Sequence, residues 1–518
     1  MADLKEAEKV LDFELHKVSR KPTLHTGEII LIHQSHGPEL TRSLSWLGAL
    51  GLAFSISNSW IGYAATLGTM LTYGGGQTSL FGAILGGVAQ WIVLLGTAEL
   101  ASAFPSSGGH YHFTYWLAPR GTRKLASFTV GMITLLAWWI SLISGLIYIT
   151  TSVFGIVAFW TPGFVIREWQ IYLGLGLWGW LTGPDRAWNH TVIPLFSVPV
   201  EKTDYMTRTT LAVSIVGLVV TIVILPAMGG NDYHPENIMI NRNQSGWATP
   251  TGWLLSMAQA EYSFVGAGTI VHLAEETPRP DRILPFVINM TTLIGLLGVI
   301  PWVIGVLCGI DDVDAVQRAF VPSLEAYYQV TGSKAAATFL QACIALICYT
   351  AICAQWITNS RIAWTLARDN GLPFSRYWNH IDPQYKFPVR TALLSAAFTV
   401  LFGVIYIAST TAFNSMINIT TLLANVAFTI PQGILAIGGR NKLPARHFNL
   451  GRFGYPVNIF SVLWLILSGV LFCLPVTLPT TLSSMNYGSV VLVGIFLAIL
   501  LMYIERRGKF SGPQILHA

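Results

Sequence analysis

Charged residues are scarce in this chain. Only 11% of the 518 residues are charged and 53% are hydrophobic, whereas about a quarter of the residues are charged in an average soluble domain. A chain with so little polar surface cannot fold as a series of water-soluble domains. Its formal net charge of +5 is small and no segment forms a basic stripe, so we expect no nucleic acid as a partner.

Cysteine is also rare, and the motifs of several chemistries are absent. The five cysteines lie in apolar stretches, without the paired spacing of a zinc site or a disulfide framework. The sequence has no HExxH, no histidine box, no GxSxG elbow and no glycine–lysine motif for ATP phosphates. We therefore expect neither an enzyme nor an ATP-driven pump, and no cofactor or metal. His110 and His112 lack further ligands nearby and are interpreted as surface or loop histidines.

Long apolar runs are the main feature of the sequence. A hydrocarbon core about 30 Å thick requires roughly 20 apolar residues in a helix. Eleven segments meet this requirement, and a twelfth, at 169–181, is short and is counted as the fourth span. We predict an all-α, polytopic membrane protein with about twelve transmembrane helices. The eleven clear segments are 44–71, 79–104, 125–159, 210–228, 252–273, 284–310, 335–358, 391–407, 412–437, 457–474 and 487–503.

Basic residues orient the predicted helices, because cytosolic loops carry an excess of Lys and Arg. With twelve spans and both termini in the cytosol, the external loops contain only Arg167, Arg242, Arg318 and Lys334 as basic residues. We therefore expect a cytosolic tail at 1–42, a transporter domain at 43–504 and a cytosolic tail at 505–518. We expect the plasma membrane as the location, with the vacuolar membrane as the alternative.

Two spans contain polar or glycine-rich stretches at mid-membrane. The first has the sequence FSISNSW at 54–60, whose hydroxyls and amide can compete with helical hydrogen bonds. The sixth has EYSFVGAGT at 261–269, in which two glycines lower helix stability by about 1 kcal/mol each. Interrupted helices at matching positions of two five-helix halves are typical of transporters with inverted repeats and a midplane site. The alternative is two intact helices that use these groups to pack.

Four stretches together resemble a known superfamily. They are AFSISNSW at 53–60, AELASAFP with GGHY at 98–111, HLAEETP at 272–278, and SR with ARDNGLP at 360–373. The chain is similar to the amino acid, polyamine and organocation transporters, and within them to the fungal amino acid and choline permeases. The resemblance implies twelve helices, the first ten in two inverted repeats as in the leucine transporter. It also implies that substrate binds between broken helices one and six.

The resemblance has two departures. Relatives usually have an acidic residue where this chain has Gly268. Any substrate contact made by that carboxylate in relatives is therefore not assigned to this chain. The fourth span is shorter than in relatives, which leaves an inactive or regulatory paralogue as an alternative.

The candidate substrate site consists of residues at the two interruptions. Backbone N–H groups at a helix start suit a carboxylate, and carbonyl groups at a helix end suit an ammonium group. Glu261 is the ionisable residue nearest the second interruption. An ionisable residue at this depth marks a substrate or proton pathway. The alternative is that Glu261 is hydrated in a wide external vestibule. Aromatic side chains there either pack or hold a cation. The candidate substrate-binding residues are Ser55, Ser57, Asn58, Ser59, Trp60, Glu261, Tyr262, Phe264, Gly266 and Gly268.

The predicted function is secondary active transport by alternating access. We expect an amino acid, choline, γ-aminobutyrate or a similar amine as substrate, with a co-transported proton. A channel for small organic cations is the rival, although no selectivity filter is recognisable. Glu99, Glu275 and Glu276 are expected to pair with basic residues of the internal loops, as an inward gate.

Overall fold

The computed structural model describes residues 44–182, 200–229, 233–383, 386–482 and 485–513. These residues form helices joined by loops, and their only β-type pairing is an isolated bridge between Asp382 and Phe387. The predicted tail at 1–42 lies outside them. The helices long enough to approach a bilayer's thickness are α3 (Ser59–Ala103), α5 (Arg123–Trp160), α7 (Val200–Met228), α9 (Pro280–Cys308), α12 (Lys334–Arg368), α14 (Val389–Ala408), α15 (Thr410–Gly438), α16 (Gly454–Leu471) and α17 (Gly488–Arg506).

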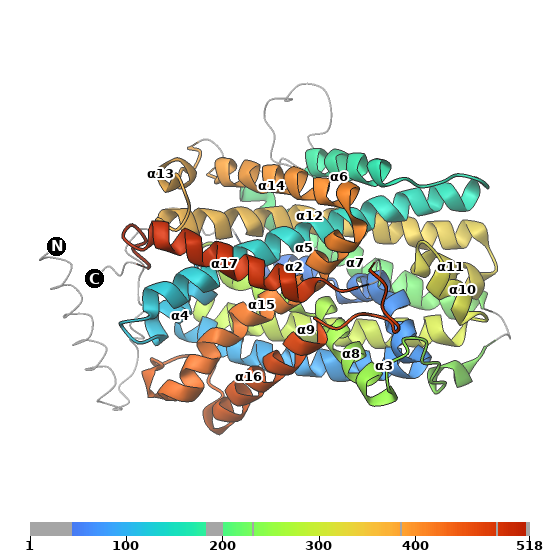
Figure 1. Cartoon of the computed structure of the whole chain (residues 1–518), viewed down its shortest axis with the longest axis horizontal. Helices are drawn as coiled ribbons and strands as arrows, with labels where there is room; N and C mark the ends of the chain where they lie inside the picture. The colour runs from blue at the N-terminus through green and yellow to red at the C-terminus, as the bar shows by residue number, and fades with distance from the viewer. Residues whose placement is uncertain (1–43, 183–199, 230–232, 384–385, 483–484, 514–518) are drawn as a thin grey trace, which may run out of the picture.

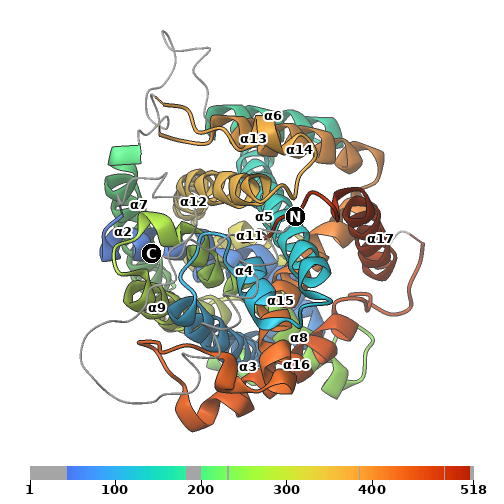
Figure 2. The same cartoon turned by 90° about the vertical axis from the view of Figure 1, so that its left-hand side faces the viewer.

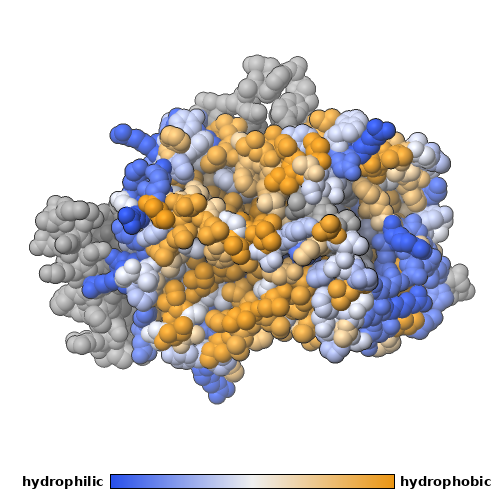
Figure 3. Space-filling model, in the orientation of Figure 1, coloured by the Kyte–Doolittle hydropathy of each residue, from blue (hydrophilic) through white to orange (hydrophobic). Residues whose placement is uncertain are grey.

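The helices run mostly parallel to the long axis of the molecule, and Figure 2 views the same bundle close to end-on. Apolar side chains form a broad band across the middle in Figure 3, with polar side chains at the two ends of the long axis. Several large apolar residues of the membrane-length helices are exposed, such as Leu297 of α9 at 64% and Leu401 of α14 at 71%. Exposure of this extent fits a surface that faces lipid. The protein is an integral, multi-pass membrane protein.

Nine stretches of the described residues are long and apolar enough to cross a membrane. The first of them, Trp46–Ala103, is long enough for two crossings. It reverses at Gly74 and Gly75, and Gly75 has the positive φ of 70° that glycine adopts without steric cost. Predicted spans one and two are therefore joined by a tight turn rather than by a separate loop.

The two spans predicted to be interrupted do not form single α-helices. The first consists of α2 (Trp46–Ser57) and the beginning of α3. The sixth consists of α8 (Thr249–Ala260), the short 3₁₀ helix η2 (Glu261–Ser263) and the longer η3 (Val265–Glu276). The predicted fourth span is α6 (Glu168–Thr182), whose 15 residues make it shorter than a crossing helix.

Short helices that the sequence did not predict cover both ends of the bundle. At one end lie α4 (His110–Leu117) and α13 (Ser375–Trp378). At the other lie η1 (Pro235–Ile238), α10 (Val313–Arg318) and α11 (Pro322–Thr331). Figure 1 shows α4 and α13 on the left and α10 and α11 on the right. Two further 3₁₀ turns are η4 (Arg440–Lys442) and η5 (Gly451–Phe453).

The core of the bundle surrounds the interrupted segments. The segment α2 packs against α7, α9, η3 and α12, and α3 packs against α8 and α9. Large side chains such as Trp60, Trp138 and Trp302 are fully buried between these elements. The interruptions therefore lie inside protein, as they must, because unpaired backbone groups are not tolerated against lipid.

Candidate substrate-binding site

The first interruption is a single residue, Asn58. Its φ of 30° and ψ of 59° place it in the left-handed region, which Asn visits more readily than other residues with a Cβ. Its N–H donates to the carbonyl of Phe54 (2.6 Å), and its carbonyl accepts from the N–H groups of Ile61 and Gly62 (2.9 and 3.0 Å). The carbonyl end of α2 and the amide end of α3 therefore meet here, at about the middle of the span.

The second interruption touches the first. A Cβ on Gly266 would lie 2.5 Å from the Cα of Ser57, so only glycine permits this approach. The Ser57 hydroxyl donates to the carbonyl of Ser263 (3.2 Å). Backbone contact between η3 and the end of α2 thus fixes the two interrupted spans against each other.

A small cavity of about 70 Å³ adjoins this contact. Its walls come from α2, α3, α5, η2, η3, α12 and α15, and none of the lining residues carries a charge. A cavity of this size holds a few water molecules at most, since each occupies about 30 Å³ in the liquid. The lining residues are Ser55, Ile56, Ser57, Asn58, Ile61, Gly62, Ala65, Trp138, Ser141, Gly145, Tyr148, Tyr262, Val265, Gly266, Cys348, Ala351, Ile352, Gln355 and Thr420.

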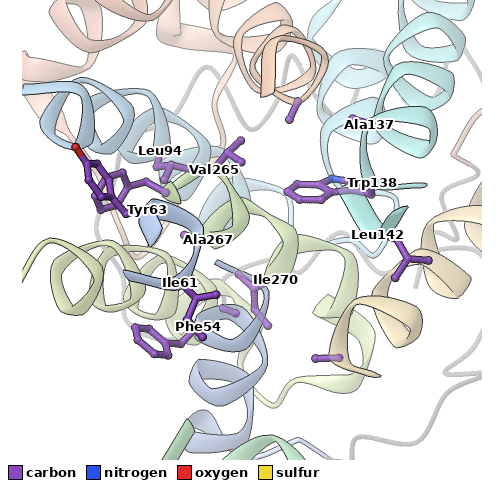
Figure 4. Close-up of a cluster of buried hydrophobic side chains, with 14 of the residues drawn as sticks. Phe54, Ile61, Tyr63, Leu94, Ala137, Trp138, Leu142, Val265, Ala267 and Ile270 are labelled. Atoms are coloured by element: carbon purple, nitrogen blue, oxygen red, sulfur yellow. The ribbon is translucent and has the colours of Figure 1, made fainter. Parts of the chain in front are cut away.

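Three aromatic side chains contribute to the walls. Figure 4 shows the ring of Trp138 extending from α5 toward the segments that carry Ile61 and Val265. The Tyr262 hydroxyl bonds to the Ser144 hydroxyl (2.9 Å), and the Tyr148 hydroxyl to that of Ser323 (3.3 Å). Ring faces around an uncharged cavity can attract an organic cation.

Two N–H donors of the cavity residues have no partner among the described residues. One is the side-chain amide nitrogen of Asn58, whose oxygen accepts from the Ser214 hydroxyl (3.0 Å). The other is the indole nitrogen of Trp138. Buried donors are usually satisfied, so both are available to an acceptor on a ligand.

The predicted site residues divide into two groups. Ser55, Ser57, Asn58, Tyr262 and Gly266 line the cavity, whereas the other five do not. The Trp60 indole donates to the Ser214 hydroxyl (3.4 Å). Ser59 and Phe264 pack beside Gly295, and Gly268 packs against the ring of Phe428. Glu261 accepts a hydrogen bond from Asn425, on α15.

Sequence reasoning missed the walls contributed by α5 and α12. Trp138 and Tyr148 lie on α5, and Cys348 and Gln355 lie on α12. The carbonyl of Trp138 accepts from Asn359 (3.0 Å) and Gln355 (3.5 Å), which joins the two helices beside the cavity. No motif marks these residues, because both helices are apolar on several sides.

Buried ion pairs gather at the end of the bundle near α4. Glu276 bonds through both oxygens to Arg361 on α12 (2.7 and 3.1 Å), and both side chains are almost fully buried. Glu275 pairs with Arg368 (3.1 Å). Glu99 pairs with Arg440 and Arg446 (2.5 and 2.7 Å) from the segment after α15. All three predicted carboxylates thus pair with arginines.

The two histidines of α4 are not surface residues, as the sequence interpretation had them. His110 and His112 are both buried. The Nε2 atom of His112 bonds to the Asp369 carboxylate (2.8 Å), which Tyr111 also contacts (3.0 Å). No group of three or more metal ligands occurs in the described part of the chain.

The family of the chain follows from its sequence matches. A family model described as amino acid permease matches residues 44–496. This chain belongs to the amino acid permease family. The permease is 29% identical to the choline transporter of Saccharomyces cerevisiae over 477 residues, which cover 91% of this chain and 82% of that protein. It is 25% identical to the amino-acid permease BAT1 of Arabidopsis thaliana, with 95% and 97% covered.

Solved structures show the fold of the permease. It superposes on a manganese transporter of Eremococcus coleocola with a TM-score of 0.51 at 13% identity, covering 93% of this chain and 96% of that one. At this identity the match concerns the fold alone. The permease therefore has the fold of a membrane transporter.

Proposed function

We propose that this permease is a secondary active carrier for a small organic amine, such as an amino acid, γ-aminobutyrate or choline. The observation that carries the proposal is the uncharged, partly aromatic cavity at the point where both interrupted spans meet. Transporters with interrupted helices bind their substrates at such midplane positions.

The ammonium group binds to the aromatic side of the cavity. Trp138, Tyr148 and Tyr262 offer ring faces, and each cation–π contact contributes about 0.5–2 kcal/mol. The carbonyl groups that end α2 at Ser57 add partial negative charge. Because no carboxylate lines the cavity, the site suits a bulky or quaternary ammonium group as well as a primary one.

The opposite end of the substrate carries oxygen. The N–H groups of Asn58 and Trp138 that lack a partner among the described residues supply donors. The start of α3, whose Ile61 and Gly62 line the cavity, adds the partial positive charge of a helix N-terminus. A carboxylate or a hydroxyl oxygen fits these donors. The site therefore accepts zwitterionic amino acids as well as an amino alcohol.

The paired carboxylates near α4 form the inward gate. Glu99, Glu275 and Glu276 join α3 and η3 to α12 and to the segment after α15 through arginines. We place this end in the cytosol, with both termini, because the predicted internal loops hold most Lys and Arg. Opening of these pairs releases substrate inward. We place the permease in the plasma membrane, with a proton gradient as the driving force.

Counterflow in proteoliposomes tests the function. The purified full-length permease is reconstituted, loaded with unlabelled candidate amines, and supplied outside with trace labelled choline or amino acid. A carrier accumulates label transiently when the internal solute is its substrate. Competition among choline, amino acids, γ-aminobutyrate and polyamines then identifies the class.

The Asn58→Leu variant tests the proposed substrate site. The substitution removes the side-chain amide at the first interruption, so uptake by the variant is expected to fall to background while its membrane expression persists. Asn289→Leu is the control for loss of an amide alone, since Asn289 lies in the regular helix α9 with its amide bonded to Trp91 and Pro285. Uptake without counterflow would indicate a channel. No uptake of any amine would indicate an inactive paralogue, and normal uptake by Asn58→Leu would remove the first interruption from the site.

A further inference from the structure

Glu261 is a buried carboxylate outside the substrate cavity. Its side chain has 0% exposure, and it begins η2 after the twelve residues of α8, about 18 Å along the helix from Thr249. One carboxylate oxygen accepts a hydrogen bond from the amide of Asn425. The other oxygen has no hydrogen-bond partner among the described residues. The carboxylate thus lies deep in the protein with half of its acceptor capacity unused.

Side chains of three other elements surround this carboxylate, directly or through Asn425. Gln90 of α3 donates its amide to the side-chain oxygen of Asn425 on α15 (2.9 Å), so the nitrogen of Asn425 remains to donate to Glu261. The indole of Trp464 on α16 lies near the carboxyl group, and its N–H has no hydrogen-bond partner among the described residues. Gln90 also has an oxygen without a partner in the described part of the chain. The hydrogen-bonded series Gln90–Asn425–Glu261 therefore ends on a carboxyl group with one oxygen left unbonded by the described residues.

No cation neutralises Glu261 within the described residues. The helices α8 and α15 contain no acidic, basic or histidine residue. The only such residue of α3 is Glu99, which lies about 13 Å from Gln90 along the helix and is paired with arginines. In η3 the titratable groups are His272, Glu275 and Glu276, all toward its far end, and α16 has Tyr455 at its start. A buried charge without a partner is unfavourable, so burial in this conformation favours the neutral carboxyl group over the ionised one.

The position of Glu261 links it to the cavity. In a 3₁₀ helix each residue turns by about 120°, so neighbouring side chains point in different directions. Glu261 faces α15, and the next residue, Tyr262, lines the cavity and bonds to Ser144 on α5. A single short helix therefore carries one residue of each site. Any shift of η2 that hydrates an ionised Glu261 also moves Tyr262.

We propose that the Glu261 carboxyl binds the co-transported proton at a site separate from the substrate cavity. A proton from the side of higher proton concentration adds to the free carboxylate oxygen, and the neutral carboxyl allows η2 to close over the substrate. After the inward opening the same proton leaves to the other side. The inference rests on the proposed carrier function and names the group that couples transport to the gradient.

The test compares wild type with Glu261→Gln in proteoliposomes, using choline and the amino acids of the competition panel. Glutamine has the shape of a protonated glutamate but cannot release a proton. Counterflow, which needs no gradient, is expected to persist in Glu261→Gln. Accumulation driven by an inward proton gradient is expected to fall to the level that wild type reaches without a gradient, and substrate-induced proton entry, followed with an internal pH dye, should vanish.

The outcomes separate the two proposals. Absence of counterflow in wild type contradicts the carrier function itself. Counterflow in both proteins, with gradient-driven accumulation unchanged in Glu261→Gln, overturns the proton site alone. If Glu261→Gln exchanges no substrate, the Glu261→Asp variant tests the proton site instead, because it retains a titratable carboxyl group in a shifted position. A displaced pH midpoint of uptake then supports the site, and an unmoved midpoint contradicts it.

Discussion

Single residues determine which groups the cavity presents. Asn58 occupies the left-handed conformation at the interruption, and its amide nitrogen has no partner within the described part of the chain. Trp138 adds a ring face from a different helix, and its indole N–H likewise has no partner there. Together these two residues offer both kinds of contact that an amine with an oxygen function requires.

Trp138 is expected to contribute to binding through its ring. Trp138→Ala should raise the substrate concentration for half-maximal uptake by about 2- to 30-fold, the range that a cation–π contact of 0.5–2 kcal/mol implies. Trp138→Phe should restore part of the loss. Trp139→Phe is the control, because Trp139 packs against Phe398 in a tilted arrangement and does not line the cavity. An unchanged half-maximal concentration in Trp138→Ala would place the amine elsewhere.

At the scale of elements, the two interrupted spans act through their contact. The segment η3 reaches the end of α2 because Gly266 has no side chain, and Ser57 bonds to the carbonyl of Ser263. The same short helix η2 carries Tyr262 toward the cavity and Glu261 toward α15. Movement of either interrupted span therefore alters the cavity.

Gly266→Ala is expected to disturb this contact. The added methyl group would overlap the backbone of Ser57, and overpacking of this kind costs about 1–3 kcal/mol. We expect a lower melting temperature in detergent and loss of counterflow. Gly494→Ala on α17 is the control, since a Cβ there meets nothing within 4 Å. Equal melting temperatures and activities for the two variants would contradict the close approach.

At the scale of the whole molecule, the bundle is closed around the site. The cavity is only about 70 Å³, and buried ion pairs join the elements at the end near α4. Substrate can enter or leave only if the elements around the cavity move. Such motion is what alternating access requires.

Labelling of Cys348 is expected to report this motion. Cys348 lines the cavity, whereas Cys353, on the same helix, is buried and does not line it. In a variant that keeps only Cys348, a small maleimide should react slowly and should be blocked by saturating substrate. A variant that keeps only Cys353 provides the control and should show no protection. Equal protection of the two would indicate a general stabilisation rather than occupancy of the cavity.

The class of the protein follows from its amino-acid sequence. Long apolar runs with few charges require a helical membrane protein, and the stretches at 53–60, 98–111, 272–278 and 360–373 carry the family resemblance. The irregular backbone could also be located, because Ser, Asn and Gly disfavour a helix and are concentrated at the middle of two apolar runs. The inverted repeat, the orientation and the substrate stay predictions.

Which side chains share the cavity depends on the folded arrangement of the helices. Glu261 and Tyr262 are neighbours in sequence, yet one faces Asn425 and the other Ser144, because direction depends on the 3₁₀ geometry of η2. Trp138 and Cys348 join the site from helices whose apolar surfaces give no sign of which side faces inward. In a membrane both lipid and protein interior favour apolar residues, so hydrophobic pattern alone cannot distinguish a cavity wall from a lipid contact.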